Sequence, residues 1–185
     1  LGGKKEILDW NYDVWSYPHL GRPRGGDRVA DLVAAWYLEK PFQRPERLPI
    51  HAPHVGSHRN ADPLYPFPKK RIVKHFVPDS PLRTSAMRGL GAYGNIFAIE
   101  SFMDELAHAA GIDPVAFRLN NLQDERARAV IQAAALKAGW DAGGAIGENR
   151  DQNPGFGRGI AFAQYKNRQC YAAVVVELRV DQETG

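Results

Sequence analysis

The residues best suited to bind a ligand lie together in residues 87–94. Three of them are glycines, Gly89, Gly91 and Gly94, which allow a backbone to approach a ligand closely because they carry no Cβ. The segment directly precedes the longest predicted helix, and the free amides and dipole at a helix start favour an anion such as phosphate. Arg88 adds a permanent charge and a forked set of donors. We therefore predict an anion-binding loop here.

The same loop fits the dinucleotide-binding pattern Gly-x-Gly-x-x-Gly, which by itself is weak evidence. A nicotinamide-binding fold also needs a strong strand before the loop and another strand after the helix. Residues 81–87 make a poor strand, and the helix is followed by Asp113-Pro114 and more helix. Two other interpretations stay open on local sequence: a stand-alone phosphate- or nucleotide-binding domain without redox activity, and a connector that binds nothing.

Other candidate residues are less suited to binding a ligand or a metal ion. His51, His54 and His58 have ligand-like spacing, but no cysteine or carboxylate pattern accompanies them, so we expect loop histidines and no metal site. Cys170 is the single cysteine, which excludes an internal disulfide and a self-contained iron–sulfur cluster. We expect it to pack in a sheet. Residues 155–159 are glycine-rich but lead into a strand, which favours a tight turn over a second phosphate cradle.

Three acidic residues, Glu100, Asp104 and Glu105, fall on the longest predicted helix. Carboxylates on a helix are usually exposed, so we expect solvated or capping charges and no general base. Gln164 lies at the end of a predicted strand, where only family analogy would suggest a cofactor contact.

The elements that must position the loop follow from hydrophobic period and turn residues. The chain has 185 residues and 44% hydrophobic content, enough for a buried core. The expected fold class is α+β: a two-layer sandwich of mixed or antiparallel strands with a block of helices. We expect strands at 7–17, 71–77, 159–165 and 171–180, helices at 28–39, 96–110, 113–122 and 124–138, a loop at 20–26, and an irregular proline-rich surface stretch at 41–68.

Charge and hydropathy exclude some classes of protein. The net charge of +3 is scattered, and the basic cluster at residues 69–75 is expected to be a solvated strand edge, so we expect no nucleic-acid partner. No apolar run in this sequence approaches the roughly 20 residues of a membrane span. The strand at 171–180 runs into a turn without a following partner strand, which predicts a segment excised from a longer protein.

Longer motifs resemble a known family. Residues 84–91, followed by 97–106 and then 110–122, resemble the large subunit of the xanthine dehydrogenase and aldehyde oxidase family, and so do 157–161 and 181–185. Within that family, Trp15-Ser16, the 59–65 loop and residues 91–93 are most similar to the large (beta) chains of isoquinoline 1-oxidoreductases. The resemblance divides the chain into an irregular proline-rich segment, 1–79, with short strands and one helix, and a partial molybdopterin cofactor-binding domain, 80–185.

The resemblance implies a molybdenum hydroxylase that oxidatively hydroxylates an N-heterocycle or aldehyde with oxygen from water. The implied cofactor is molybdopterin with molybdenum, in its cytosine dinucleotide form. The implied partners are the rest of the large subunit and a small [2Fe-2S] subunit that carries the iron–sulfur clusters. The family's catalytic glutamate has no matching motif in this chain, so we expect the isolated segment to be inactive. A bacterial-type protein is implied, with a cytoplasmic or periplasmic location left open.

The resemblance also assigns site residues. It makes Arg88 a catalytic pocket residue that orients substrate or stabilises developing negative charge. Leu90 lines the substrate pocket where many relatives have phenylalanine, which leaves substrate preference open. The expected cofactor-binding residues are Arg88, Gly89, Leu90, Gly91 and Ala92.

Overall fold

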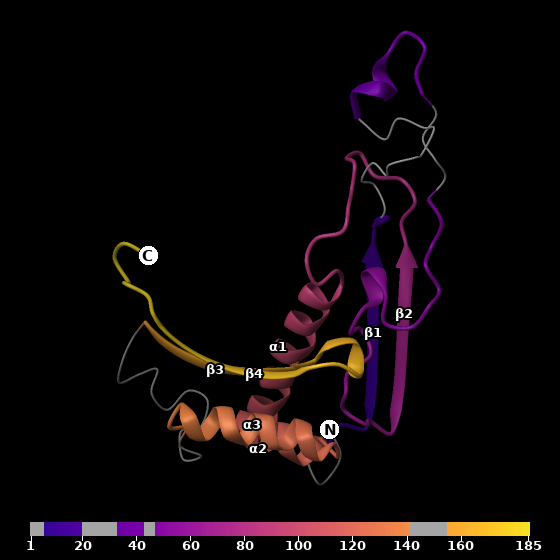
Figure 1. The fold of residues 1–185 in the computed structure, drawn as a ribbon. Coiled ribbons are helices and arrows are strands. Elements are labelled where there is room, and N and C mark those ends of the chain that lie inside the picture. Colours follow the sequence, from indigo (N-terminus) through magenta and orange to yellow (C-terminus); the bar gives the residue numbers. More distant parts are fainter. Residues whose placement is uncertain (1–5, 20–32, 43–46, 141–154) are drawn as a thin grey trace.

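The structure, a computed structural model, describes residues 6–19, 33–42, 47–140 and 155–185. It contains helices and two small sheets, which confirms the α+β class (Figure 1). Its elements in chain order are β1 (Asp9–Ser16), η1 (Val33–Tyr37), η2 (Gly56–His58), β2 (Lys69–Phe76), α1 (Ala92–Ala110), α2 (Pro114–Asn121), α3 (Glu125–Lys137), β3 (Phe156–Gln164), η3 (Tyr165–Asn167) and β4 (Tyr171–Arg179).

Local signals predict the end of α1 and the starts of α2 and α3, whereas α1 begins at Ala92, four residues before its predicted start and without a side-chain cap. Gly111 closes α1 in the left-handed conformation, with φ of 62°. Asp113 caps α2 by accepting hydrogen bonds from the amides of Val115 and Ala116. Asp124 caps α3 by accepting from the Ala127 amide at 2.9 Å. The helix block is therefore specified largely by its own caps.

The strands form two separate pairs. β1 and β2 are parallel, with Asp9 opposite Lys69 and Ser16 opposite Phe76. β3 and β4 form an antiparallel hairpin, with Gln164 opposite Tyr171. Figure 1 shows β1 and β2 upright beside α1, while the hairpin lies across α2 and α3.

One hydrophobic core joins elements from both halves of the chain. Met103 and Phe117 of the helix block are fully buried, and Trp10 of β1 stacks on Phe67 with ring centroids 4.9 Å apart. Tyr65 and Phe67 come from the stretch that we expected to run over the surface, and both are buried. That expectation was wrong for these residues, because their rings fill the space between β1 and α1.

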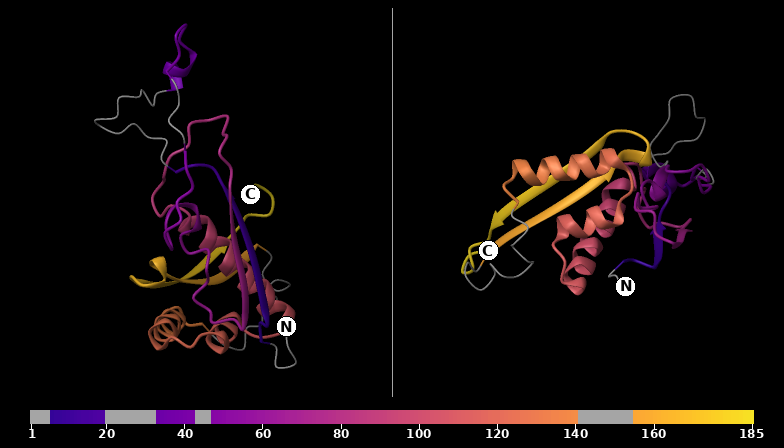
Figure 2. Two further views of the ribbon diagram at one scale, coloured as in Figure 1. Left: turned by 90° about the vertical axis from the view of Figure 1, so that its right-hand side faces the viewer. Right: turned by 90° about the horizontal axis from the view of Figure 1, so that it is seen from below.

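Among the described residues, helices cover one face of the hairpin. The helix α3 packs against one side of it (Figure 2), where Val175 contacts the core. Val174, Val176 and Leu178 point to the opposite face of β4 from Val175 and are about half exposed, at 55%, 51% and 51%. Their partners across the ladder include Ala161 and Gly159. The exposed face of this sheet is therefore apolar and smooth.

Some expectations fall partly or wholly outside the described residues. The loop at 20–26 does, and so do residues 28–32 of the expected helix at 28–39. Its described part forms the short 3₁₀ helix η1. Among the described helices, none combines the length and the hydropathy that crossing a membrane would require.

Candidate functional site

The segment that leads into the glycine loop is tied to the end of β1. The Thr84 hydroxyl donates to the Pro18 carbonyl at 2.7 Å, and the Ala86 amide donates to the His19 carbonyl at 2.9 Å. These two bonds fix where the chain enters the loop.

The loop itself is a tight turn with two left-handed residues. Gly89 has φ of 82° and Leu90 has φ of 53°. The Leu90 amide donates to the Met87 carbonyl at 3.0 Å, and the Ala92 amide donates to the Gly89 carbonyl at 3.1 Å. The turn therefore requires the conformation that glycine adopts freely, and Leu90 adopts it at a cost of about 1 kcal/mol or more.

Gly91 serves packing within the protein. A Cβ at this position would lie 1.9 Å from the Ser57 carbonyl oxygen, and the Gly91 amide donates to the Gly56 carbonyl at 3.0 Å. Gly94, by contrast, has open space where a methyl group would lie. The three glycines thus differ: Gly89 provides the turn, Gly91 the close approach of η2, and Gly94 neither.

The buried amide side chain of Asn95 also holds η2 against the start of α1. Its Nδ2 donates to the carbonyls of Ser57 and Arg59 at 2.8 and 2.9 Å, and its Oδ1 accepts from the Tyr12 hydroxyl at 2.8 Å. Asn95 is only 3% exposed. It therefore joins β1, η2 and the start of α1 through one side chain, which the sequence analysis did not single out.

The groups left available at the loop are donors. Arg88 is exposed, and no described carboxylate lies within ion-pair distance of it. Among the described residues, no group accepts from the Arg88 or Gly89 amides, and no side chain caps the start of α1. Leu90 is half-buried and Ala92 is buried, with both amides bonded inside the turn. An anionic ligand would therefore meet Arg88 and Gly89 first.

A second buried amide, Asn60, anchors the hairpin to this region. Its Nδ2 donates to the Gln164 carbonyl and to Asn167 Oδ1, both at 2.8 Å, and its Oδ1 accepts from the Lys166 amide at 3.0 Å. Arg59 donates to the Tyr165 hydroxyl. Gln164, predicted as a strand-end residue, is buried beneath this junction.

We had expected Glu100 to be a solvated charge, but its side chain is buried. Its carboxylate accepts hydrogen bonds from Arg118 Nε at 2.8 Å, the Tyr65 hydroxyl at 2.9 Å and the Phe162 amide at 2.9 Å. Burial raises the pKa of Glu100, opposed by the charge of Arg118 and by these donors. Asp104 accepts from the same arginine at 2.6 Å and is partly exposed. With its oxygens occupied, Glu100 holds α1, α2 and β3 together and is not placed as a base.

The remaining candidates are located as follows. The described residues contain no group of three or more His, Cys, Asp and Glu side chains that could bind a metal ion. Cys170 is exposed just before β4, so the expectation that it packs in the sheet was wrong. Gly155 has φ of 87° and β3 starts directly after it, which agrees with a turn.

In the basic cluster at residues 69–75, carboxylates of β1 pair with Lys69, Arg71 and His75. Lys69 contacts Asp9 at 2.7 Å, and Asp13 accepts from both Arg71 and His75. These contacts lower the pKa of Asp13, with the His75 hydrogen bond as the largest cause. The cluster therefore joins β2 to β1 and does not present an unpaired basic stripe.

The family model of the molybdopterin cofactor-binding domain matches residues 51–122, which include η2, the loop and α1. One of the subunits of nicotinate dehydrogenase from Pseudomonas putida is 36% identical over 145 residues, 74% of this chain and 12% of that protein. The chain belongs to the xanthine dehydrogenase family of molybdopterin-binding subunits.

Further relatives agree with this family. The beta chain of isoquinoline 1-oxidoreductase from Brevundimonas diminuta is 31% identical over 119 residues, 64% of this chain and 14% of that protein. The xanthine dehydrogenase molybdenum-binding subunit of Escherichia coli O157:H7 is 55% identical over 40 residues, 22% of this chain and 5% of that protein. The chain thus spans a small part of the length of these family members.

Proposed function

We propose that this chain forms one wall of the molybdopterin site in a molybdenum hydroxylase that acts on an N-heterocycle or an aldehyde. The observation that carries the proposal is the Arg88–Gly89 turn. It offers an exposed guanidinium and two amides that have no acceptor within the described part of the chain, directly before an uncapped helix. These donors fit an anionic cofactor. When bound, molybdopterin supplies the redox chemistry that protein side chains lack.

Each residue of the loop has a distinct part in this proposal. The amides of Arg88 and Gly89 would bind the cofactor. Gly91 and Ala92 would hold the backbone in place through their own bonds to Gly56 and Gly89. The Arg88 guanidinium would orient the substrate and stabilise negative charge that develops on it. Leu90 is half-buried and follows Arg88 by two residues in the sequence. In this proposal its side chain would line the substrate pocket.

The N-heterocycle class is supported by the names of two relatives, nicotinate dehydrogenase and isoquinoline 1-oxidoreductase, since nicotinate and isoquinoline are both N-heterocycles. Both relatives are named as subunits, which supports an assembly with other chains. In this proposal, one of these chains is a small [2Fe-2S] subunit. In the same proposal the cofactor has the cytosine dinucleotide form.

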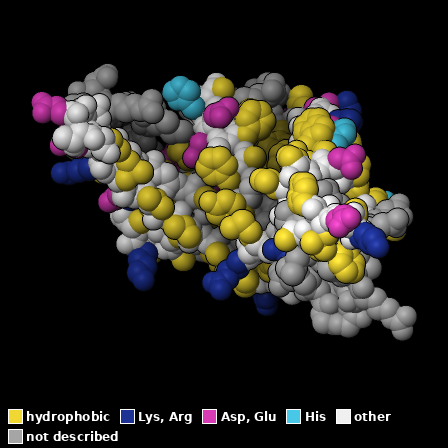
Figure 3. Space-filling view, turned by 90° about the horizontal axis from the view of Figure 1, so that it is seen from above, with side chains coloured by type: hydrophobic (Ala, Val, Ile, Leu, Met, Phe, Trp, Pro, Cys, Tyr) yellow, Lys and Arg dark blue, Asp and Glu magenta, His cyan; other side chains and the backbone are white. Residues whose placement is uncertain are grey.

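The apolar outer face of β3 and β4 supports packing against further protein. Figure 3 shows hydrophobic side chains in a row along the side of the molecule where the hairpin lies. Val174, Val176 and Leu178 contribute to this exposed apolar surface. Because contiguous apolar surface of this kind is usually covered, we propose that the rest of the large subunit packs here.

The experiment replaces Arg88 with alanine and with lysine in the full-length protein. We expect Arg88→Ala to reduce kcat/KM by about 100-fold or more, the size of effect found when a charge-stabilising donor is removed. Arg88→Lys should recover part of the loss. Molybdenum content and the melting temperature separate catalysis from cofactor loading and folding. Arg126→Ala, an exposed arginine on α3, is the matched control. Unchanged turnover and molybdenum content in Arg88→Ala would contradict the proposal.

A further inference from the structure

A second concave site lies near the ends of β1 and β2, next to η2. Its volume is about 70 Å³, so it suits a small chemical group. Four of its lining residues are basic: His19, Arg47, His58 and Lys74. No Asp or Glu of the described residues lines it. The remaining walls are largely apolar, from residues such as Ile50 and Phe76.

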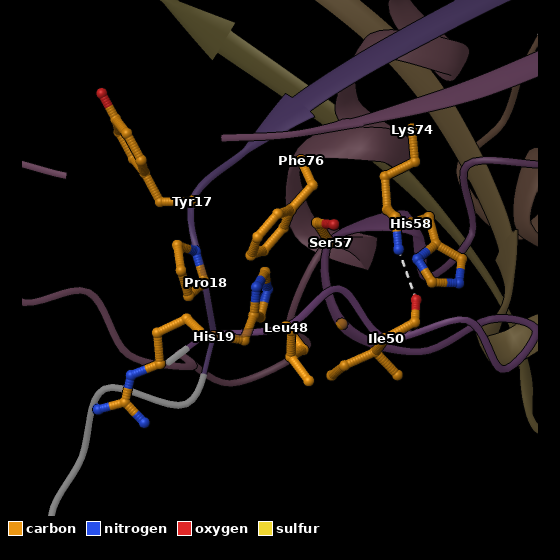
Figure 4. A pocket seen from close by; sticks show the side chains of 11 residues that line it. Tyr17, Pro18, His19, Leu48, Ile50, Ser57, His58, Lys74 and Phe76 are labelled. Atoms are coloured by element: carbon orange, nitrogen blue, oxygen red, sulfur yellow. Dashed lines mark hydrogen bonds between the residues drawn. The ribbon is translucent and has the colours of Figure 1, made fainter. Parts of the chain in front are cut away.

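The ammonium group of Lys74 is held inside this pocket. Its Nζ donates to the Ile50 carbonyl at 2.5 Å, and Figure 4 shows the side chain beside His58. Burial lowers the pKa of Lys74 from its ordinary value. In contrast, Lys69 and Lys70 of the same strand pair with Asp9 and Asp62. The recorded partner of Lys74 is a neutral carbonyl, so its charge is not balanced by a carboxylate there.

His58 has a buried ring nitrogen that has no partner among the described residues. Its Nε2 donates to the Ala52 carbonyl at 2.7 Å, because a carbonyl can only accept. Its Nδ1 is buried and has no hydrogen-bond partner among the described residues. Burial, followed by the charges of Lys74, His54 and His19, lowers the pKa of His58, so the ring is neutral near pH 7. An anion would favour proton uptake at Nδ1 and so give the buried nitrogen a partner.

We propose that this pocket binds an oxyanion of the phosphate class, through Lys74 and the two histidines. Basic side chains, a small volume and a described lining without a carboxylate all favour an anion over a metal cation. The pocket also shares Gly56 and Ser57 with the contact that holds Gly91. An oxyanion here would therefore stabilise the η2 turn on which the glycine loop rests.

Calorimetry with inorganic phosphate at constant ionic strength tests this on the full-length protein, both loaded with cofactor and free of it. We expect saturable binding, with net proton uptake near pH 7, that Lys74→Met weakens about tenfold or more. Lys137→Met, which removes an exposed lysine on α3, should leave it unchanged. If Lys74→Met fails to fold, His19→Gln provides a second variant and should weaken binding several-fold.

The two preparations distinguish the source of the oxyanion. Phosphate binding to both supports a free anion as the ligand, whereas binding only to the cofactor-free protein supports a phosphate group of the cofactor itself. A lack of saturable phosphate binding in both preparations would overturn the proposal. So would equal loss of binding in Lys74→Met and Lys137→Met. Neither result depends on whether Arg88 acts in turnover.

Discussion

Arg118 donates from Nε to the Glu100 carboxylate at 2.8 Å, and neither side chain is more than 4% exposed. The same arginine reaches the Pro114 and Glu100 carbonyls and Asp104. Burial is the largest single influence on the pKa of Arg118 and lowers it, but Glu100, Tyr65 and Asp104 together raise this pKa above its ordinary value. Arg118 therefore stays charged, and its bonds to Glu100 join α1 to α2.

Arg118→Met should be among the most damaging single changes in this chain. It leaves Glu100 buried without its countercharge, which typically costs about 3–5 kcal/mol in the free energy of unfolding. Urea denaturation measures the loss. The double variant Glu100→Gln, Arg118→Met should lose less than the sum of the two single variants, because the residues act as one unit. Arg126→Met, on the exposed side of α3, should change stability by only about 0.5 kcal/mol, and an equal loss in both arginine variants would contradict this role.

Gly91→Ala and Gly94→Ala should have opposite effects on stability. A methyl group on Gly91 meets the Ser57 carbonyl oxygen, so η2 must shift and stability should fall by about 1–3 kcal/mol. The same group on Gly94 enters open space within α1 and should stabilise by about 0.5–1 kcal/mol. Thermal unfolding of both variants tests the difference. Similar melting temperatures would mean that the two glycines do not differ as described.

Leu90→Phe should change substrate preference more than stability. Leu90 is half-buried, so a larger ring is tolerated, and the added aromatic surface should raise kcat/KM for aromatic heterocycles relative to aliphatic aldehydes by about tenfold, equivalent to about 1.4 kcal/mol. Steady-state kinetics with both substrate types measures this ratio. Leu90→Gly relieves the left-handed strain and serves as the control for backbone effects. An unchanged ratio in Leu90→Phe would remove Leu90 from the proposed pocket.

Asp124→Ala should destabilise α3 by about 1 kcal/mol, because it removes the side chain that caps the helix. The bond from the Ala127 amide is the largest cause that lowers the pKa of Asp124, with a further bond from Tyr171. A lowered pKa means that the contribution is complete above the ordinary carboxyl pKa and is lost as pH falls through the folded value. The difference between parent and variant should therefore shrink below about pH 4. Urea denaturation at pH 7 and pH 3 measures it, and a constant difference would contradict the cap.

The helices were predictable from sequence because their signals are local. Asp113-Pro114, Asp124 and Gly111 each act within one turn of the helix end that they define. Periodicity likewise located the four strands, but it could not pair them, since β1 meets β2 across a long connection. The fold class could thus be predicted, whereas the arrangement of the strands required tertiary structure.

The candidate site was predictable only in part, for the same reason. Glycine and arginine types marked the loop, but Asn95 bonds to carbonyls 36 and 38 residues away, which no local pattern encodes. Glu100 was misjudged because its partners Tyr65 and Arg118 lie 35 and 18 residues away. One signal was present in the sequence: Glu100 falls within the apolar stripe of Ile96, Met103 and Ala107, where a lone charge calls for a buried partner.

The parallel pairing of β1 and β2 has a consequence for how the chain folds. Asp9 and Lys69, which face each other at the start of the ladder, are 60 residues apart, whereas the β3–β4 hairpin closes over η3. Long loops close more slowly and at a higher entropic cost than short ones. We therefore expect the helix block and the hairpin to form before β1 and β2 pair. The glycine loop, whose entry is tied to the residues just after β1, would reach its final shape in the last step of folding.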